Sequence, residues 1–141
     1  MKGNLFSFMT WHLDTMDIRS QKSEIERRRA AFDAIEGTES YTLCADNLVI
    51  GCGGIVPLWE GVGEIWMVSS IHIERYKIEA IKQILTFLKS VGASFHRLQA
   101  TVDTEDKRAV RFIEWLGFER EGTLRKYGFS GSDHYIYARI L

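Results

Sequence analysis

Apolar residues recur along this chain with two periods, and each change of period marks the border of an expected element. The segment 5–11 is apolar enough for a strand. A helix is predicted to open near Ser23, because Ser23 and Glu26 make a capping-box pair, and to end at Gly37. Its apolar residues recur at helical spacing and share one face: Ile25, Phe32 and Ile35.

A period of two follows and predicts three strands. They are expected at 41–45, 48–56 and 63–68. Asp46 and Asn47 form a turn pair that joins the first two strands into a hairpin. Three glycines in the second strand indicate a bulge or a place where another group approaches the backbone closely: Gly51, Gly53 and Gly54.

The second half of the chain returns to a helical period. A helix is predicted over 77–91, with an inner face made of Ile78, Ile81, Ile84, Leu85, Leu88 and Val91. A strand at 95–102 precedes a helix that opens with the acidic run 103–106, where the helix dipole favours negative charge. Two strands, at 119–129 and 133–140, end the chain.

This order of elements predicts an α/β fold of the α+β kind, with a central mixed sheet and helices on both faces. A strand, a helix and a second strand in succession form a crossover that places the two strands parallel. We therefore expect strands 63–68 and 95–102 to be parallel neighbours.

Composition narrows the class of protein further. The 141 residues, 45% apolar and 26% charged, are typical of one globular domain, 1–141. With 18 basic and 19 acidic residues there is no basic surplus, so no nucleic-acid partner is expected. No apolar stretch approaches the roughly 20 residues that span a bilayer, and the start lacks signal-peptide features. We expect a soluble, cytoplasmic protein without a membrane partner.

The cysteines and histidines indicate no special chemistry. Cys44 and Cys52 lie in apolar, strand-like segments, and two cysteines make no disulfide framework, so reduced thiols are expected. The four histidines have no metal-ligand spacing to a cysteine, an aspartate or another histidine. No metal site is predicted.

The segment from Asp106 to Gly122 carries the most specific motif. A known pattern reads roughly Asn-x-x-Ala-x-x-(Phe/Leu)-Tyr-x-x-x-Gly-Phe-x-x-x-Gly. The residues that agree with it are Ala109, Phe112, Gly117, Phe118 and Gly122. By this motif and by its order of elements, the chain from Tyr41 to Leu141 resembles the GCN5-related N-acetyltransferase (GNAT) superfamily. The resemblance implies the GNAT-like acyl-CoA N-acyltransferase fold and acetyl-CoA as co-substrate.

The acyl-CoA loop of that superfamily reads (Arg/Gln)-x-x-Gly-x-(Gly/Ala), and its backbone N–H groups cradle a pyrophosphate. Here Arg75 and Ala80 match, Ile78 replaces the glycine, and Glu79 adds a negative charge that Arg75 and Lys77 could offset. The alternative is an amphipathic helix without a phosphate site. The cofactor-binding residues that the resemblance implies are Met67, Val68, Arg75, Lys77, Ile78, Glu79, Ala80, Ile81 and Asp106.

Acetyl transfer to an amine needs a general base. In the resemblance, Glu64 takes this role, because a glutamate eleven residues before Arg75 (75 − 64 = 11) serves the histone-acetylating branch. Asp103, beyond the next strand, is the reserve. The alternative for Glu64 is a solvated carboxylate at a strand edge. Ile113 stands where the superfamily has a tyrosine that acts as the general acid. The residues that could take over this role are Tyr127, Tyr135, Tyr137 and His72.

Two functions follow from these observations. The first is an N-acetyltransferase that moves an acyl group from acetyl-CoA to a primary amine of a small molecule or a protein. The second is a catalytically silent protein of this fold that acts through protein–protein contact, as a homodimer or with a virion partner. The run Trp66-Met67-Val68-Ser69-Ser70 resembles small acetyltransferase-fold proteins of tailed bacteriophages, which implies a bacterial host cytoplasm or a virion.

Overall fold

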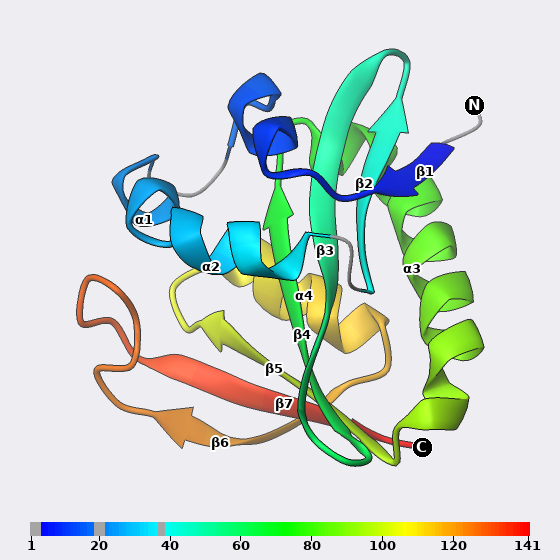
Figure 1. The fold of residues 1–141 in the computed structure, drawn as a ribbon. Coiled ribbons are helices and arrows are strands. Elements are labelled where there is room, and N and C mark those ends of the chain that lie inside the picture. Colours follow the sequence, from blue (N-terminus) through cyan, green and yellow to red (C-terminus); the bar gives the residue numbers. More distant parts are fainter. Residues whose placement is uncertain (1–3, 19–21, 37–38) are drawn as a thin grey trace. The chain divides into compact units, whose positions relative to one another are not determined.

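We analysed the chain in a computed structural model, which describes residues 4–18, 22–36 and 39–141 (Figure 1). The strands are β1 (Asn4–Ser7), β2 (Ser40–Ala45), β3 (Leu48–Trp59), β4 (Val62–Ser69), β5 (Arg97–Asp103), β6 (Glu119–Leu124) and β7 (His134–Ile140). The α-helices are α1 (Lys22–Arg27), α2 (Arg29–Ile35), α3 (Lys77–Val91) and α4 (Lys107–Trp115). Short 3-10 helices are η1 (Thr10–Thr15), η2 (Ile73–Tyr76) and η3 (Gly92–Ser94).

The strands form a seven-stranded mixed sheet in the order β1-β2-β3-β4-β5-β7-β6. The pairs β1–β2, β2–β3, β5–β7 and β6–β7 are antiparallel, whereas β4 and β5 are parallel. The mixed sheet and the parallel pair expected from the order of elements are therefore confirmed. No helix in the part of the chain that the structure describes is long and apolar enough to cross a membrane.

Contacts within the chain divide it into two compact units. The N-terminal unit comprises Met1–Val56 and Trp66–Phe87, and the C-terminal unit comprises Pro57–Ile65 and Leu88–Leu141. The single domain expected from the length stays a prediction.

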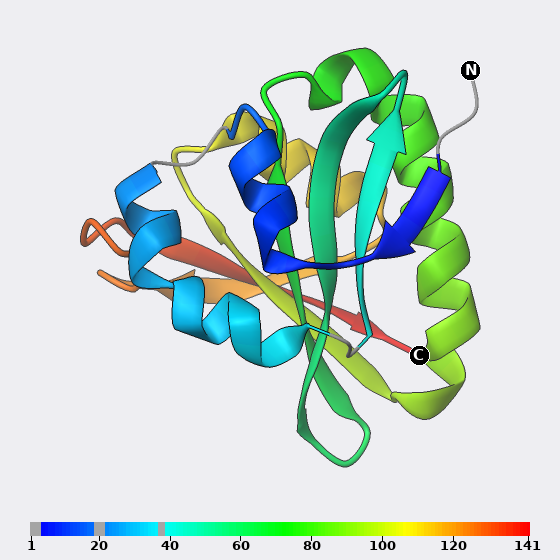
Figure 2. The same ribbon diagram turned by 45° about the horizontal axis from the view of Figure 1, so that its top comes forward.

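The N-terminal unit has apolar packing on both faces of β2 and β3. On one face, η1, α1 and α2 contribute to a buried cluster made of Phe8, Leu13, Met16, Ile25, Phe32, Cys52 and Val68. On the other face, η2 and the start of α3 complete a second cluster made of Leu43, Ala45, Ile50, Ile73, Tyr76 and Ala80. Figure 2 shows α1, α2 and η1 on one side of β2 and β3, and the first turns of α3 on the other.

The N-terminal third differs from its sequence prediction in two places. The helix expected from Ser23 is two helices, α1 and α2, separated at Arg28, whose N–H lies 3.1 Å from the carbonyl oxygens of both Glu24 and Ile25. Because α1 begins at Lys22, Ser23 lies inside the helix and not at its cap. Gly37 lies outside the described residues. The strand expected at 5–11 is the shorter β1, followed by η1.

The glycines of β3 mark a close approach of backbones. A Cβ atom built on Gly53 would lie 2.8 Å from the carbonyl oxygen of Trp66 on β4, and one built on Gly54 would lie 2.3 Å from that of Glu39. Real Cβ atoms do not come so close to backbone atoms. The sequence predicted that another group approaches the backbone of β3 closely. The groups that do so are the backbone segments at Trp66 and Glu39.

Replacing Gly53 with alanine is expected to destabilise the protein by about 1–3 kcal/mol, the usual cost of forcing an extra group into a packed site. Gly122→Ala is the matched control, because its new Cβ would meet only a methyl group of Ile136, at 3.8 Å. Its stability should be unchanged or raised by a few tenths of a kcal/mol. Urea unfolding of the three proteins measures the difference, and equal midpoints would contradict the close approach.

In the C-terminal unit, α4 and the strands β5, β7 and β6 share a core. Leu98 and Tyr137 have no exposed surface, and Ile113, Leu116 and Phe118 are at most 6% exposed. The β6 strand ends at Leu124, five residues before the predicted 129 (129 − 124 = 5), because the backbone turns at Lys126, which has a φ of 55°.

Candidate functional site

The residues that the sequence assigned to phosphate binding lie in the N-terminal unit, at the start of α3. The 3-10 helix η2 runs directly into α3 at Lys77, so one helical path begins at Ile73. The buried side of this path is formed by Ile73, Tyr76 and Ala80. Ile78 is 68% exposed. The prediction that Ile78 lies on the inner face is wrong, because the apolar stripe of the helix starts in η2. Leu85 is exposed as well.

Ala80, which agrees with the loop motif, is a buried residue of the core. Its side chain is fully buried in the cluster that holds Leu43 and Ile50. The hydroxyl of Tyr76 donates to Asp46 at 3.1 Å, which ties the turn between β2 and β3 to η2. A larger residue at position 80 would have to displace this core.

The start of α3 limits which backbone groups could meet a phosphate. In an α-helix each N–H bonds the carbonyl four residues earlier, so the amides of Ala80 and Ile81 bond Tyr76 and Lys77. Of the predicted set 78–81, only the amides of Ile78 and Glu79 belong to the first turn.

Charged side chains surround this first turn. The guanidinium of Arg75 lies over the ring of Tyr76, 5.5 Å from its centroid. The carboxylate of Glu79 accepts a hydrogen bond from Gln83 Nε2 at 3.2 Å. The start of α3 therefore has two cationic side chains, Arg75 and Lys77. It also has one carboxylate, Glu79, which is hydrogen-bonded to Gln83 of the same helix.

On β4, the two residues that the resemblance assigned to cofactor binding, Met67 and Val68, point to opposite faces. Val68 is buried among the cluster below η1, so only its backbone could face a ligand. Met67 is 39% exposed, and its methyl group lies 3.7 Å from the place of a Cβ on Gly51. Trp66 packs against the rings of Phe8 and Phe32, with centroids 5.1 and 5.5 Å away. Trp66 is thus a partly buried residue that packs against the core of the N-terminal unit.

Glu64 lies in the C-terminal unit, on the paired part of β4. The parallel ladder joins Val62 to Arg97 and ends with Glu64 opposite Gln99. The printed pairing ends there, although β4 itself continues to Ser69. Glu64 is partly exposed, and among residues 4–18, 22–36 and 39–141 no hydrogen bond or ion pair to its carboxylate is found.

Asp103, the reserve base, has a structural role. One carboxylate oxygen accepts from the Glu105 N–H at 2.9 Å, and the other accepts from the Ser132 hydroxyl at 2.9 Å. One oxygen therefore holds the turn that follows β5, and the other holds the β6–β7 connection to the end of β5. Asp106 is the N-cap of α4 and accepts from the Ala109 N–H at 3.1 Å, as the acidic run predicted.

Two of the tyrosines that could replace the missing acid of α4 lie in one network of contacts. Ile113 is a buried core residue. The buried hydroxyl of Tyr137 donates to Glu114 at 2.7 Å and accepts from Arg120 at 3.1 Å, and burial raises the pKa of Tyr137. The guanidinium of Arg120 also covers the ring of Tyr135, at 3.7 Å. These two tyrosines are held in a structural network.

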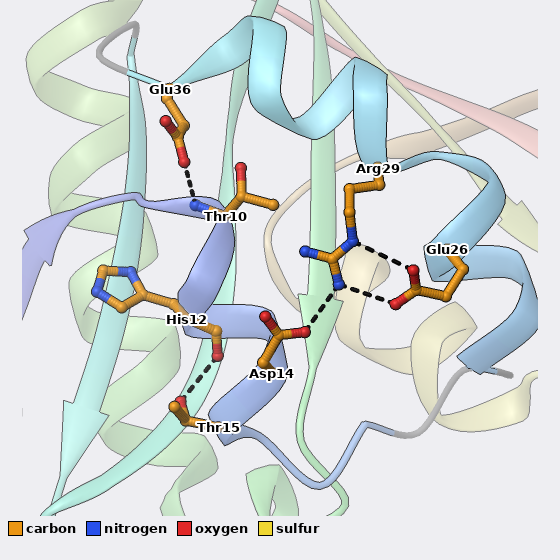
Figure 3. A network of polar contacts seen from close by, with 7 residues as sticks. All are labelled: Thr10, His12, Asp14, Thr15, Glu26, Arg29 and Glu36. Atoms are coloured by element: carbon orange, nitrogen blue, oxygen red, sulfur yellow. Dashed lines mark hydrogen bonds and ion pairs between the residues drawn. The ribbon is translucent and has the colours of Figure 1, made fainter.

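A second polar site, which the sequence did not predict, surrounds η1 in the N-terminal unit (Figure 3). Arg29 of α2 bridges Asp14 at 2.7 Å and Glu26 at 2.9 Å. The carboxylate of Glu36 accepts a short hydrogen bond from the backbone N–H of Thr10, which lowers the pKa of Glu36. These contacts fasten η1 to α1 and α2.

A pocket of about 170 Å³ lies beside these ion pairs. Its apolar walls are Leu13, Met16, Ile18 and Ile25. Arg29 faces the pocket but is already paired with two carboxylates. The pocket therefore offers no uncompensated cation to a ligand.

Deeper in the unit, His12 contacts Thr42, and Thr42 contacts Cys52. Burial raises the pKa of the Cys52 thiol to about 12, so it is not a nucleophile near neutral pH. The signal that could have found this group is a histidine three residues after Met9, in the place where a capping box has an acidic residue.

The seven-stranded mixed sheet, with its parallel β4–β5 pair and flanking helices, defines a mixed α/β architecture. Comparison with solved structures identifies that architecture more closely. The GNAT-family acetyltransferase of Bacillus anthracis is 19% identical to this chain, with a TM-score of 0.73 over 99% of this chain and 95% of its own. Ard1 of Thermoplasma volcanium is 16% identical, with a TM-score of 0.74 over 100% and 99%.

A chain of the NatC complex, solved with a Gag peptide and CoA, is 16% identical, with a TM-score of 0.75 over 100% of this chain and 99% of its own. No protein-family model matches the chain, and comparison with curated proteins finds no match. The chain therefore has the fold of the GNAT acetyltransferases, as the motif at 106–122 implied. The resemblance to bacteriophage proteins stays a prediction.

Proposed function

We propose that this protein is an N-acetyltransferase that transfers an acetyl group from acetyl-CoA to a primary amine. The observation that carries the proposal is the likeness in fold, along the whole chain, to acetyltransferases of which one is solved with CoA. Two features of this chain support it. Arg75 and Lys77 provide positive charge at the start of α3, and the Glu64 carboxylate is unpaired among the described residues.

In this proposal, the neutral amine attacks the thioester carbonyl carbon, an N–C bond forms and the C–S bond breaks. Glu64 takes the proton that the amine loses, directly or through one water molecule. Solvent supplies the proton that the CoA thiolate needs, because Ile113 cannot donate one. The pyrophosphate of acetyl-CoA lies at the start of α3, near Ile78 to Ile81, with Arg75 and Lys77 as its cations.

Acetyl-CoA binding tests this proposal. Because Ile78 occupies the place of the motif glycine, we expect weak binding, with a Kd in the micromolar range or higher, by isothermal titration. Ile78→Gly should tighten binding by about tenfold, which corresponds to about 1.4 kcal/mol. Ile78→Ala is the control that shortens the side chain without freeing the backbone, and it should give a smaller gain. Unchanged or weaker affinity in the glycine variant would mean that this turn is not a phosphate site.

The second candidate function, a silent protein of this fold acting through protein contact, is favoured by one observation. Ile113, at the position of the tyrosine, is part of the core. Absence of acetyl-CoA binding, together with absence of turnover on primary amines, would favour this second function.

A further inference from the structure

The ring of His12 is held in one protonation state by its neighbours. Its Nδ1 atom lies 3.1 Å from the backbone nitrogen of Met9 and 2.7 Å from the hydroxyl oxygen of Thr42. A backbone N–H can only donate, so Nδ1 must accept and carries no proton. The neutral ring therefore has its hydrogen on Nε2.

The same pair of residues forms a reciprocal contact that begins η1. The His12 N–H donates to the Met9 carbonyl at 2.9 Å, while the His12 side chain accepts from the Met9 N–H. This arrangement resembles a capping box in which an imidazole replaces the usual carboxylate. At the other end, the Thr15 hydroxyl donates to the His12 carbonyl at 2.9 Å (Figure 3). His12 is thus bonded at both ends of η1.

A chain of buried hydrogen bonds extends this contact into the sheet. Thr42 of β2 is fully buried, and its hydroxyl lies 3.4 Å from the sulfur of Cys52 on β3. With Nδ1 as acceptor, its single lone pair is shared between the Met9 N–H and the Thr42 hydroxyl, and the Cys52 thiol can donate to Thr42. On protonation of the ring, the Thr42 hydroxyl can rotate and accept, but the Met9 N–H cannot reverse.

We propose that His12 is a pH-dependent latch that holds η1 on β2 and β3. A proton on Nδ1 directs its N–H against the N–H of Met9, so the reciprocal contact breaks and the segment from Met9 to Thr15 opens. The latch does not depend on the proposed acetyl transfer.

The groups that face His12 favour its neutral form. Burial lowers the pKa of His12, and the negative charge of Glu36 offsets this only in part. Cys52 is uncharged near neutral pH, and the rings of Phe8 and Trp11, with centroids 6.4 and 4.3 Å from the imidazole, carry no charge. Because the folded protein binds this proton less readily than the unfolded chain, protonation favours opening.

The sign of the pH effect follows from this difference. A histidine in the unfolded chain has a pKa of about 6.5, and the pKa of folded His12 lies below its ordinary value. The stability that neutral His12 provides is complete above about pH 6.5 and is lost as the pH falls toward the folded pKa. In that window the folding equilibrium constant loses up to about tenfold per pH unit, the limit for one proton.

His12→Asn is the matched variant, because the asparagine Oδ1 can accept from Met9 and Thr42 at the place of Nδ1 but does not titrate. Urea unfolding of both proteins between pH 7.5 and 5 should give a wild-type equilibrium constant that falls more steeply than that of the variant. The other three histidines and all carboxylates are common to both proteins, so their effects cancel in the comparison. Parallel pH profiles would overturn the latch.

A second measurement covers the case in which the variant does not fold. Nitrogen chemical shifts of wild-type His12 at pH 7.5 should show the Nε2–H tautomer, and the amide protection of η1 should fall relative to that of β5 as the pH is lowered to 5. A proton on Nδ1 at pH 7.5, or η1 protection that follows β5, would overturn the proposal.

Discussion

Glu64→Gln is expected to lower kcat for acetyl transfer by about 10²-fold at neutral pH, the usual contribution of a general base. Glutamine keeps the size and the hydrogen-bonding oxygen of the side chain but cannot take a proton. The loss should shrink as the pH rises, because more of the amine is then already neutral. Steady-state rates between pH 6.5 and 9.5, measured with a primary amine and saturating acetyl-CoA, provide the test.

The matched control for Glu64 is Glu60→Gln, which removes an exposed carboxylate from the turn of the same β3–β4 hairpin and should leave the rate unchanged. Asp103→Asn distinguishes the reserve base, whose oxygens hold Ser132 and Glu105. A loss of stability with a normal pH–rate profile is expected there. An unaltered profile in Glu64→Gln would remove this carboxylate from the mechanism.

Phe8→Ala is expected to lower the free energy of unfolding by about 3–5 kcal/mol, the usual cost of deleting a buried aromatic ring. Phe8 has no exposed surface and contacts Trp66, Phe32 and His12 edge-on, with centroids 5.1, 6.4 and 6.4 Å away. This ring joins the segment before η1 to α2 and β4. Removal of the ring would therefore cost a large part of the free energy of unfolding, which is about 5–15 kcal/mol for a typical domain.

Phe6→Ala is the control, because Phe6 lies two residues away on the edge strand β1 and is 52% exposed. Its effect should stay within about 0.5 kcal/mol. Phe8→Leu should cost less than Phe8→Ala, which keeps the comparison measurable if the alanine variant is unfolded. Denaturant unfolding provides the values, and equal losses at positions 6 and 8 would contradict the packing described for Phe8.

The sequence predicted correctly a turn and a helix cap that are determined by residues close together in the chain. Asp46 and Asn47 form the expected tight turn, both with positive φ, and Asp106 caps α4 as its acidic run indicated. Of the predicted inner face of α3, Leu88 is buried, whereas Ile78 and Leu85 are exposed, because the apolar stripe begins in η2, before the segment in which the period was counted. The break at Arg28 involves no glycine or proline, so no local pattern marked it.

The sequence predicted only those residues of the candidate site that belong to a recognisable motif. The resemblance named Glu64 and the start of α3, but it did not indicate that Asp103 would be engaged on both oxygens or that Ala80 would be a core residue. His12 was missed because its partner Thr42 is thirty residues away in the chain (42 − 12 = 30). Contacts of that kind depend on strand register, which no short pattern specifies.

The two units are interleaved in the chain, and this bears on how the protein is made. The N-terminal unit needs Trp66–Phe87 to complete it: Val68 belongs to one of its clusters, and Ile73, Tyr76 and Ala80 belong to the other. Its first 56 residues are thus separated from this completing segment by Pro57–Ile65, which belong to the other unit. No single cut in the chain separates the two units, so neither can be obtained as one contiguous fragment.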